Sequence, residues 1–496
     1  MNLTLDPWIP AVRADGTRDL FSLHALFAEA HTLRDLAVRP HERIALMRLL
    51  LCITQAALDG PGDEDAWREC RDNIQPRVRA YLDQWRTAFE LFGDGPRFLQ
   101  LANLQPGKDT DEGNPATKLD LASATGNNST LFDNAAGEAR RVKGARAALN
   151  LLTFQCFSPG GRIGVARWNG HDTPGKGSSN HAPCTPSSML HTIILGANLL
   201  ETIARNLLTQ QLVADSVAKG WGKPTWEYPI EKANDQSAIE NATLTYLGRL
   251  VPFSRAVRLQ ENGDSIILAN GFDYTIFPSY REATATIVQR KEELGVLPAS
   301  TGRSIWRQLH AITIKRRATT DQTAGPLALA LNELDHEVTL WIGALVTDKA
   351  KIEDVIEATY SVPPALFDAF GRAAYESGVK HAEGSDSALS KAIGAYSGLL
   401  KIDSPAYDRA RQHFWTCVEQ ALGDLLTIAR ELTPPDQLAA SPWGSAVRAA
   451  ALDAYERTCP RRTPRQIQAY ALGQRHLFLS ASAPNTKKSK AKAKSS

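Results

Sequence analysis

The chain has 496 residues, 43% of them hydrophobic, which is enough for two or more domains with sizeable cores. A formal net charge of +2 excludes a polycation that coats nucleic acid indiscriminately, so any nucleic-acid contact must come from local patches. No apolar run is long enough to span a membrane, and residues 1–20 lack a basic segment followed by an apolar one. We therefore expect a cytoplasmic protein without a membrane partner.

The N-terminal segment NLTLDPWIPAVRADGTRDLFSLHALF predicts a strand, a turn and a helix. Its apolar residues flank Asp6-Pro7 in a strand expected from Asn2, and Asp15-Gly16 is typical of a turn. Ser22 can cap the helix that follows. The leucine-rich stretch Pro40–Leu58 predicts a second, longer helix.

The pattern changes near residue 363. Before it, further helical segments are predicted over 64–92, 142–157 and 186–214, mixed with short alternating runs over 256–259, 265–268 and 274–277. After it, amphipathic helices are predicted over 364–379, 386–399 (with a break at Gly384), 404–431, 436–457 and 463–481. The fold class is thus α+β: a large, irregular mixed α/β domain over 1–363, then an antiparallel helical bundle over 364–481. The basic tail 482–496 is expected to be disordered.

The sequence contains none of the common motifs for catalysis or metal binding. There is no P-loop, H-E-x-x-H or G-x-S-x-G, and no acidic set at the spacing of a two-metal nuclease. The six cysteines show no C-x-x-C and no partnered histidine spacing, which predicts buried small hydrophobes. His171, His181 and His191 share no helix face and are expected to be solvated or capping. The sequence predicts no catalytic residue, metal site or cofactor.

Three polar or glycine-rich loops remain as candidate sites. In the first, over 124–143, Asn127 and Asn128 can hydrogen-bond to phosphates or base edges, and Phe132 can stack on a base. The alternative is a capped surface loop with Phe132 in the core. A basic exit follows in Arg140, Arg141 and Lys143.

The second loop, over 157–177, combines glycines with Arg162, Arg167 and Lys176. Glycines let a backbone approach a ligand closely, and the guanidinium groups supply positive charge for phosphates or the minor groove. The alternative is an ordinary flexible loop.

The third segment, WIGALVTDKA over 341–350, predicts an apolar strand and a tight polar turn before a helix from Lys351. On the residues alone this is an ordinary β-turn capped by Thr347 or Asp348.

The N-L-x-x-D-x-W-I-P opening, the leucine-rich helix and the two-part plan resemble the CasA family, the large subunit of the type I-E Cascade complex of CRISPR immunity. The resemblance implies that Phe132 lies on an aromatic position beside the guide RNA. It also implies that Gly160, Gly161 and Gly164, with Arg162 beside them, probe the minor groove of a motif flanking the target. Lys349 stands where the family's wedge hairpin has glutamine, and Arg281 is the nearest substitute for a motif-contacting lysine.

The function implied is that of a non-catalytic subunit that recognises the flanking motif (PAM) in duplex DNA, promotes strand separation and R-loop formation, and recruits a helicase-nuclease. Expected partners are the CRISPR guide RNA, the other Cascade subunits, target double-stranded DNA and that helicase-nuclease. Two alternatives stay open: a purely structural scaffold of a ribonucleoprotein, and a metal-dependent nuclease.

Overall fold

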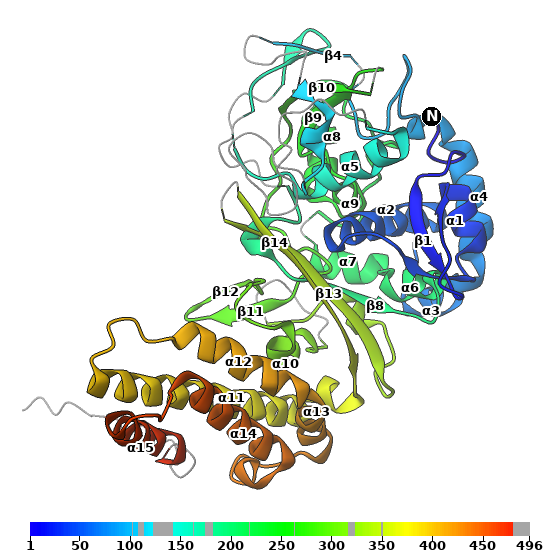
Figure 1. Ribbon diagram of the computed structural model, residues 1–496. Coiled ribbons are helices and arrows are strands. Elements are labelled where there is room, and N and C mark those ends of the chain that lie inside the picture. The colour runs from blue at the N-terminus through cyan, green and yellow to red at the C-terminus, as the bar shows by residue number, and fades with distance from the viewer. Residues whose placement is uncertain are drawn as a thin grey trace, which may run out of the picture. The chain divides into compact units, whose positions relative to one another are not determined.

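The computed structural model divides into two compact units, Met1–Val362 and Pro363–Ser496 (Figure 1). The structure describes residues 1–101, 103–107, 114–122, 142–161, 163–173, 182–217, 219–261, 263–315, 323–348 and 351–479. The first unit mixes helices with small antiparallel sheets and the second is helical. The predicted α+β fold class is therefore confirmed.

The chain opens with a small sheet and a capped helix. Strands β1 (Ile9–Arg13), β2 (Arg18–Phe21) and β3 (Leu33–Leu36) form a sheet of order β2-β1-β3. Helix α1 (Leu23–Glu29) begins as predicted, because the Ser22 Oγ accepts a hydrogen bond from the Ala25 N–H. The strand expected from Asn2 was wrong in its start: the Asn2 side chain accepts from the Thr4 N–H and closes a local turn, so the strand begins only at Ile9.

Helix α2 (Pro40–Leu58) has the predicted bounds and forms the centre of the first unit. Every residue from Ile44 to Gln55 is buried, and α2 packs against several helices and against the central hairpin. The other helices of this unit are α3 (Glu64–Glu69), α4 (Ile74–Gln84), α5 (Gly144–Phe157), α6 (Leu199–Asn206), α7 (Gln210–Ser216), α8 (Gln236–Leu244), α9 (Tyr246–Leu250) and α10 (Leu309–Ile312). The helix predicted over 186–214 was partly wrong, since its first part is strand β8 (His191–Leu195).

A long hairpin, β13 (Val338–Asp348) and β14 (Lys351–Val362), pairs through β13 with β8 (Figure 1). The helix predicted from Lys351 was wrong, because eleven residue pairs join β14 to β13 in an antiparallel ladder. The remaining strands are β4 (Leu104–Gln105), β5 (Asn114–Pro115), β6 (Arg167–Trp168), β7 (His171–Asp172), β9 (Arg255–Leu259), β10 (Ser265–Asn270), β11 (Ile287–Arg290) and β12 (Glu293–Val296). The run over 274–277 is not a strand.

A buried ionic triad holds the centre of the first unit together. The Glu282 carboxylate accepts from the Arg48 Nη1 at 2.7 Å and from the Arg249 Nε at 2.6 Å. The remaining donors of the two arginines are directed to backbone carbonyls, including those of Leu250 and Thr243. Burying two guanidinium groups is tolerable only with such complete pairing, so the triad links α2 to α9 and to the segment that carries Glu282.

The second unit contains α11 (Ala369–Leu400), α12 (Tyr407–Gln420), α13 (Leu422–Glu431), α14 (Pro442–Thr458) and α15 (Pro464–Leu479). The predicted break at Gly384 was wrong, because α11 runs through it as one helix. A single glycine costs a helix only about 1 kcal/mol relative to alanine, and α11 packs against α12, α13, α14 and α15.

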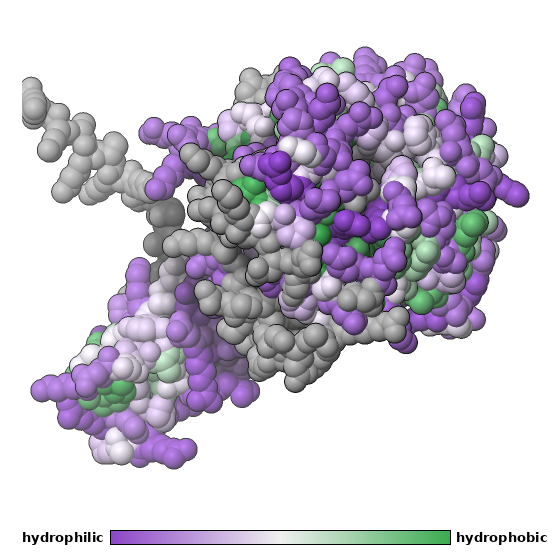
Figure 2. Space-filling view, turned by 90° about the horizontal axis from the view of Figure 1, so that it is seen from above, coloured by the Kyte–Doolittle hydropathy of each residue, from purple (hydrophilic) through white to green (hydrophobic). Residues whose placement is uncertain are grey.

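The surface view in Figure 2 is predominantly hydrophilic, with hydrophobic residues in small separate groups. Within the ranges that the structure describes, no helix combines the length and the apolar content needed to cross a bilayer.

Candidate nucleic-acid interface

The glycine loop follows a helix that is held firmly in the core. Helix α5 is buried from Ala147 to Phe157 and ends where the Ser158 N–H donates to the Phe154 carbonyl at 2.7 Å. The chain then turns through Gly160 and Gly161. Gly161 has a φ of +130°, and a Cβ placed there would have no described atom within 4 Å. The backbone at this turn is therefore open to an approaching ligand in a conformation that favours glycine.

Arg255, at the start of β9, fixes the base of this loop. Its side chain is 1% exposed; the Nε donates to the Ser158 Oγ at 2.6 Å and the Nη2 donates to the Pro159 carbonyl at 2.6 Å. Burial lowers the Arg255 pKa to about 10, so the guanidinium stays charged at neutral pH. The contacts join the end of α5 to the β9–β10 sheet.

Asn270, paired with Arg255 across that sheet, fixes the other side of the loop. The Asn270 Oδ1 accepts from the Ile163 N–H and from the Arg255 Nη1, both at 3.3 Å. The backbone N–H of Asn270 donates to the Gly164 carbonyl at 3.1 Å. Gly164 is buried with a φ of +130°, so it belongs to the base of the loop and not to its open turn.

The charges around the loop are only partly available to a ligand. Arg167, on β6, forms an ion pair with Asp172 on β7 at 2.8 Å, with both side chains more than half exposed. Arg162 and Lys176 lie outside the described residues. Lys143 is exposed immediately before α5.

The hairpin is anchored close to its end. The Thr347 N–H donates to the Ser188 Oγ at 2.9 Å, and the Ser188 Oγ donates to the Thr347 carbonyl at 3.2 Å. Farther from the end of the hairpin, the Trp341 Nε1 donates across the ladder to Glu357 at 2.8 Å. Lys349 lies outside the described residues, between the last described pair, Asp348 and Lys351. Lys351 is exposed, so the hairpin carries a cation at its end.

One segment, 182–191, contacts both the helix before the glycine loop and the hairpin. The Cys184 N–H donates to the Cys156 carbonyl on α5 at 3.1 Å, while Ser188 holds Thr347. His191 ends the segment in a fully buried position, with Nδ1 2.7 Å from the Thr284 Oγ1 and Nε2 3.2 Å from the Cys184 carbonyl. The expectation that His191 is solvated was therefore wrong.

The predicted site residues fall into three groups according to where the structure places them. Asn127, Asn128, Phe132, Arg162 and Lys349 lie outside the described residues. Gly160 and Gly161 form the open turn, and Gly164 lies in the buried base of the loop. Arg281 was a wrong choice for a DNA-contacting residue, because it is fully buried and its Nη2 donates to the Gly325 carbonyl. Arg255 and Asn270 were missed, since neither lies in a glycine-rich or basic motif.

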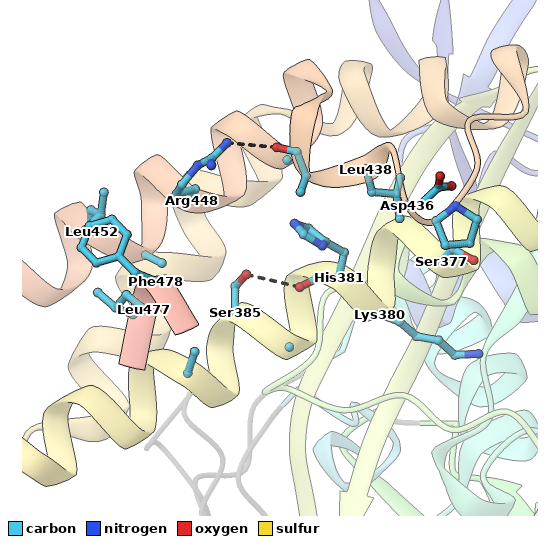
Figure 3. Close-up of a pocket in the computed structure, with 16 residues that line it drawn as sticks. Ser377, Lys380, His381, Ser385, Asp436, Leu438, Arg448, Leu452, Leu477 and Phe478 are labelled. Atoms are coloured by element: carbon cyan, nitrogen blue, oxygen red, sulfur yellow. Dashed lines mark hydrogen bonds between the residues drawn. The ribbon is translucent and has the colours of Figure 1, made fainter. Parts of the chain in front are cut away.

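Each unit also contains a sizeable cavity. In the first unit, a cavity of about 830 Å³ adjoins the β6–β7 hairpin and is lined by aromatic residues that include Trp85, Trp168 and Trp226. In the second, a groove of about 590 Å³ lies between α11 and α14 and ends at Phe478 (Figure 3). Its lining combines Lys380, Arg448 and Asp436 with apolar side chains.

Comparison with known proteins gives one consistent result. A model of the family described as CRISPR-associated protein Cse1 matches residues 2–454. The CasA/Cse1 protein of Thermus thermophilus is 31% identical over 401 residues, which cover 77% of this chain and 75% of that protein. A structure of Thermus thermophilus CasA (Cse1) matches with a TM-score of 0.74 at 25% identity, covering 97% of this chain and 99% of the other.

Two further structures share the fold. Thermobifida fusca Cse1 has a TM-score of 0.75 at 20% identity, covering 97% of this chain and 96% of the other. A chain of a structure described as a CRISPR RNA-guided surveillance complex has a TM-score of 0.72 at 20% identity, covering 96% of this chain and 99% of the other.

Proposed function

This chain belongs to the CRISPR-associated Cse1 (CasA) family, and from that premise we propose that it is the large subunit of a CRISPR RNA-guided surveillance complex. The match over residues 2–454 supports this role, as does the likeness to a chain of such a complex. In this proposal the subunit is non-catalytic, binds the guide RNA and the other subunits, and recruits a helicase-nuclease to target DNA.

The proposed task of the glycine loop is to test duplex DNA for the flanking motif. The observation that carries this part is the open turn at Gly161, held from below by Arg255 and Asn270. A backbone without side chains can enter the narrow minor groove, and the fixed base means that little conformational entropy is lost on binding. Base pairing with the guide then reads the target sequence.

The proposed task of the β13–β14 hairpin is to separate the strands. Its long ladder and the Ser188 anchor make it stiff, and Lys349 and Lys351 bring positive charge to its end. A stiff hairpin can push between base pairs, whereas a mobile loop would give way. Segment 182–191 contacts both the hairpin and α5, the helix before the glycine loop. In this proposal it therefore holds in place both the loop that binds the motif and the hairpin that opens the strands.

We expect Gly161→Asp to weaken binding to a duplex with the flanking motif roughly tenfold or more, while Gly161→Asn has a smaller effect. The two side chains have the same shape and face the same strained φ, so the difference between them isolates the negative charge near DNA phosphates. Gel-shift titrations of the assembled complex at two salt concentrations measure it. Equal losses of affinity in the two variants would show that side-chain bulk, and not negative charge, blocks the DNA. Normal binding by both would remove Gly161 from the DNA-contacting surface and favour the scaffold alternative.

We expect Lys349→Ala to slow R-loop formation on fully paired DNA and to leave binding to a pre-opened bubble target nearly unchanged. Opening a base step costs a few kcal/mol, and only a wedge becomes dispensable when the step is already open. R-loop kinetics on both substrates are the measurement, with Lys351→Ala as the matched control for loss of one charge from the same hairpin end. Equal defects on the two substrates would make Lys349 a simple phosphate contact.

A further inference from the structure

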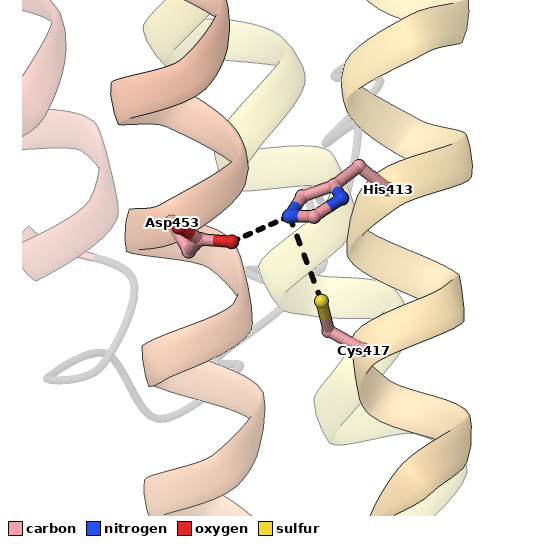
Figure 4. Close-up of side chains that lie close together, drawn as sticks. All are labelled: His413, Cys417 and Asp453. Carbon is pink, nitrogen blue, oxygen red and sulfur yellow. Dashed lines mark hydrogen bonds and ion pairs between the residues drawn. The ribbon is translucent and has the colours of Figure 1, made fainter.

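A histidine, a cysteine and an aspartate from two helices of the second unit come together near the surface (Figure 4). His413 and Cys417 lie one turn apart on α12, and Asp453 faces them from α14. The His413 Nε2 is 2.5 Å from the Asp453 Oδ2 and 3.6 Å from the Cys417 Sγ. The prediction that no cysteine has a partnered histidine spacing was therefore wrong, because His413 and Cys417 are an i,i+4 pair.

The geometry is not that of a catalytic triad. In a triad the imidazole contacts the nucleophile through one ring nitrogen and the orienting carboxylate through the other. Here both the thiol and the carboxylate converge on the same Nε2. One nitrogen cannot relay a proton between them, so the cluster is not arranged for nucleophilic catalysis.

The three possible ligand atoms all lie within 4.8 Å of one another, close enough to surround one metal ion. Tetrahedral zinc, with Zn–N near 2.0 Å and Zn–S near 2.3 Å, separates the nitrogen and sulfur by about 3.6 Å and the nitrogen and oxygen by about 3.3 Å. The His413–Cys417 separation already equals the first value, and Asp453 would withdraw by less than about 1 Å to reach the second. A side-chain rotation supplies such a movement without a shift of either helix.

The surroundings of the cluster are compatible with an ion. The His413 side chain is 31% exposed and that of Asp453 is 43% exposed, so an ion can enter and water can fill a fourth position. The Arg457 Nε donates to both oxygens of Asp453, at 3.0 and 2.9 Å. Arg457 can remain hydrogen-bonded to Oδ1 while Oδ2 turns to the ion, and this bond would orient the Asp453 carboxylate.

We propose that His413, Cys417 and Asp453 form a binding site for one divalent zinc-class ion that joins α12 to α14. The mixed nitrogen, sulfur and oxygen donors favour zinc over magnesium or calcium, which prefer oxygen alone. The occupied site would tie two helices of the second unit together and so stabilise that unit.

The test begins with the full chain stripped of metal by a chelator and then titrated with Zn²⁺ and Co²⁺. We expect one ion per chain, with a thiolate-to-cobalt charge-transfer band in the Co²⁺ form. Cys417→Ser should abolish that band. Asp453→Asn should weaken binding at least tenfold, because loss of even a group that only orients a ligand weakens metal binding by that factor. His24→Gln is the matched control, because His24 pairs with Asp83 at 3.1 Å but belongs to no group of three possible metal ligands among the described residues.

A second measurement uses the unaltered protein and does not depend on how the variants fold. Cys417 is partly exposed while the other five cysteines are buried, so a thiol-alkylating reagent should modify Cys417 first. We expect Zn²⁺ to slow this modification at least tenfold and to raise the melting temperature of the second unit. Alkylation at the same rate with and without Zn²⁺, or Zn²⁺ binding that survives Cys417→Ser, would overturn the proposal.

Discussion

Glu282→Gln is expected to lower the free energy of unfolding of the first unit by about 3–5 kcal/mol, because it leaves two buried guanidinium groups without a counter-charge. The side chains of Arg48, Arg249 and Glu282 are 4%, 1% and 5% exposed. Burial alone would raise the Glu282 pKa, but the attraction of Arg249 and Arg48 outweighs it and lowers the pKa. The carboxylate is therefore charged in the folded protein, and a neutral amide cannot replace it.

Urea unfolding at neutral pH, followed by a signal from the first unit, measures this effect. Asp172→Asn is the control, because it also removes one carboxylate from an arginine pair, but on the surface, where we expect a loss below about 1 kcal/mol. If the two variants had similar midpoints, the triad would contribute no more to stability than an exposed pair.

Acidification from pH 6.5 to pH 4 is expected to destabilise the first unit by up to about 3 kcal/mol for each of two buried histidines. Burial lowers the pKa of His41 and of His191 to about 4 in each case. The unfolded chain, with pKa values near 6.5, therefore binds more protons than the folded chain between these pH values. The free energy of unfolding is highest above the pKa that the two histidines have in the unfolded chain. It falls as the pH drops toward the pKa that they have in the folded protein. Glu282 adds its own loss at lower pH, because Arg249 and Arg48 hold its pKa below that of an ordinary glutamate side chain.

Urea midpoints measured at several pH values from 7.5 to 4.5 check this dependence. Arg48 and Glu282 act on His191 with opposite signs, so burial dominates its shift. His191→Gln should remove about half of the loss between pH 6.5 and 4, because His41 still takes up its proton in that range. A loss as large in His191→Gln as in the unaltered protein would assign the effect to His41 or to other groups. Because His191 ends the segment that holds both proposed DNA-contacting elements, its protonation should also weaken DNA binding.

Local sequence patterns were sufficient for features that a few neighbouring residues decide. Helix α2 has the predicted bounds, Ser22 caps α1, and Asp15-Gly16 turns between β1 and β2, where Gly16 has a φ of +88°. These depend on side-chain periodicity, a capping hydroxyl and a residue that tolerates positive φ. The family resemblance was also visible in the sequence, from the opening motif and the order of segments.

The candidate site could be predicted only as far as its open turn. Gly160 and Gly161 were visible as a motif, but Arg255 and Asn270 lie about 100 residues farther along the chain and become neighbours of the loop only when β9 pairs with β10. Arg281 was judged from its charge and its place in sequence, yet a buried carbonyl accepts its hydrogen bond. Burial of a cation depends on partners that the local sequence does not reveal.

Contacts between residues far apart in the chain also explain why the predictions for β14 and for Gly384 were wrong. KIEDVIEATYSV contains good helix formers, but β13 offers eleven residues of unpaired backbone beside it, and pairing with that strand makes it β14. Gly384 is a helix breaker by propensity, yet α11 continues because contacts with other helices outweigh the cost. Asp453 meets His413 and Cys417 only because α12 packs on α14. The sequence by itself thus determined the family, the local helices and turns and the glycine motif, whereas long-range pairing and burial, which depend on residues far apart in the chain, decided the rest.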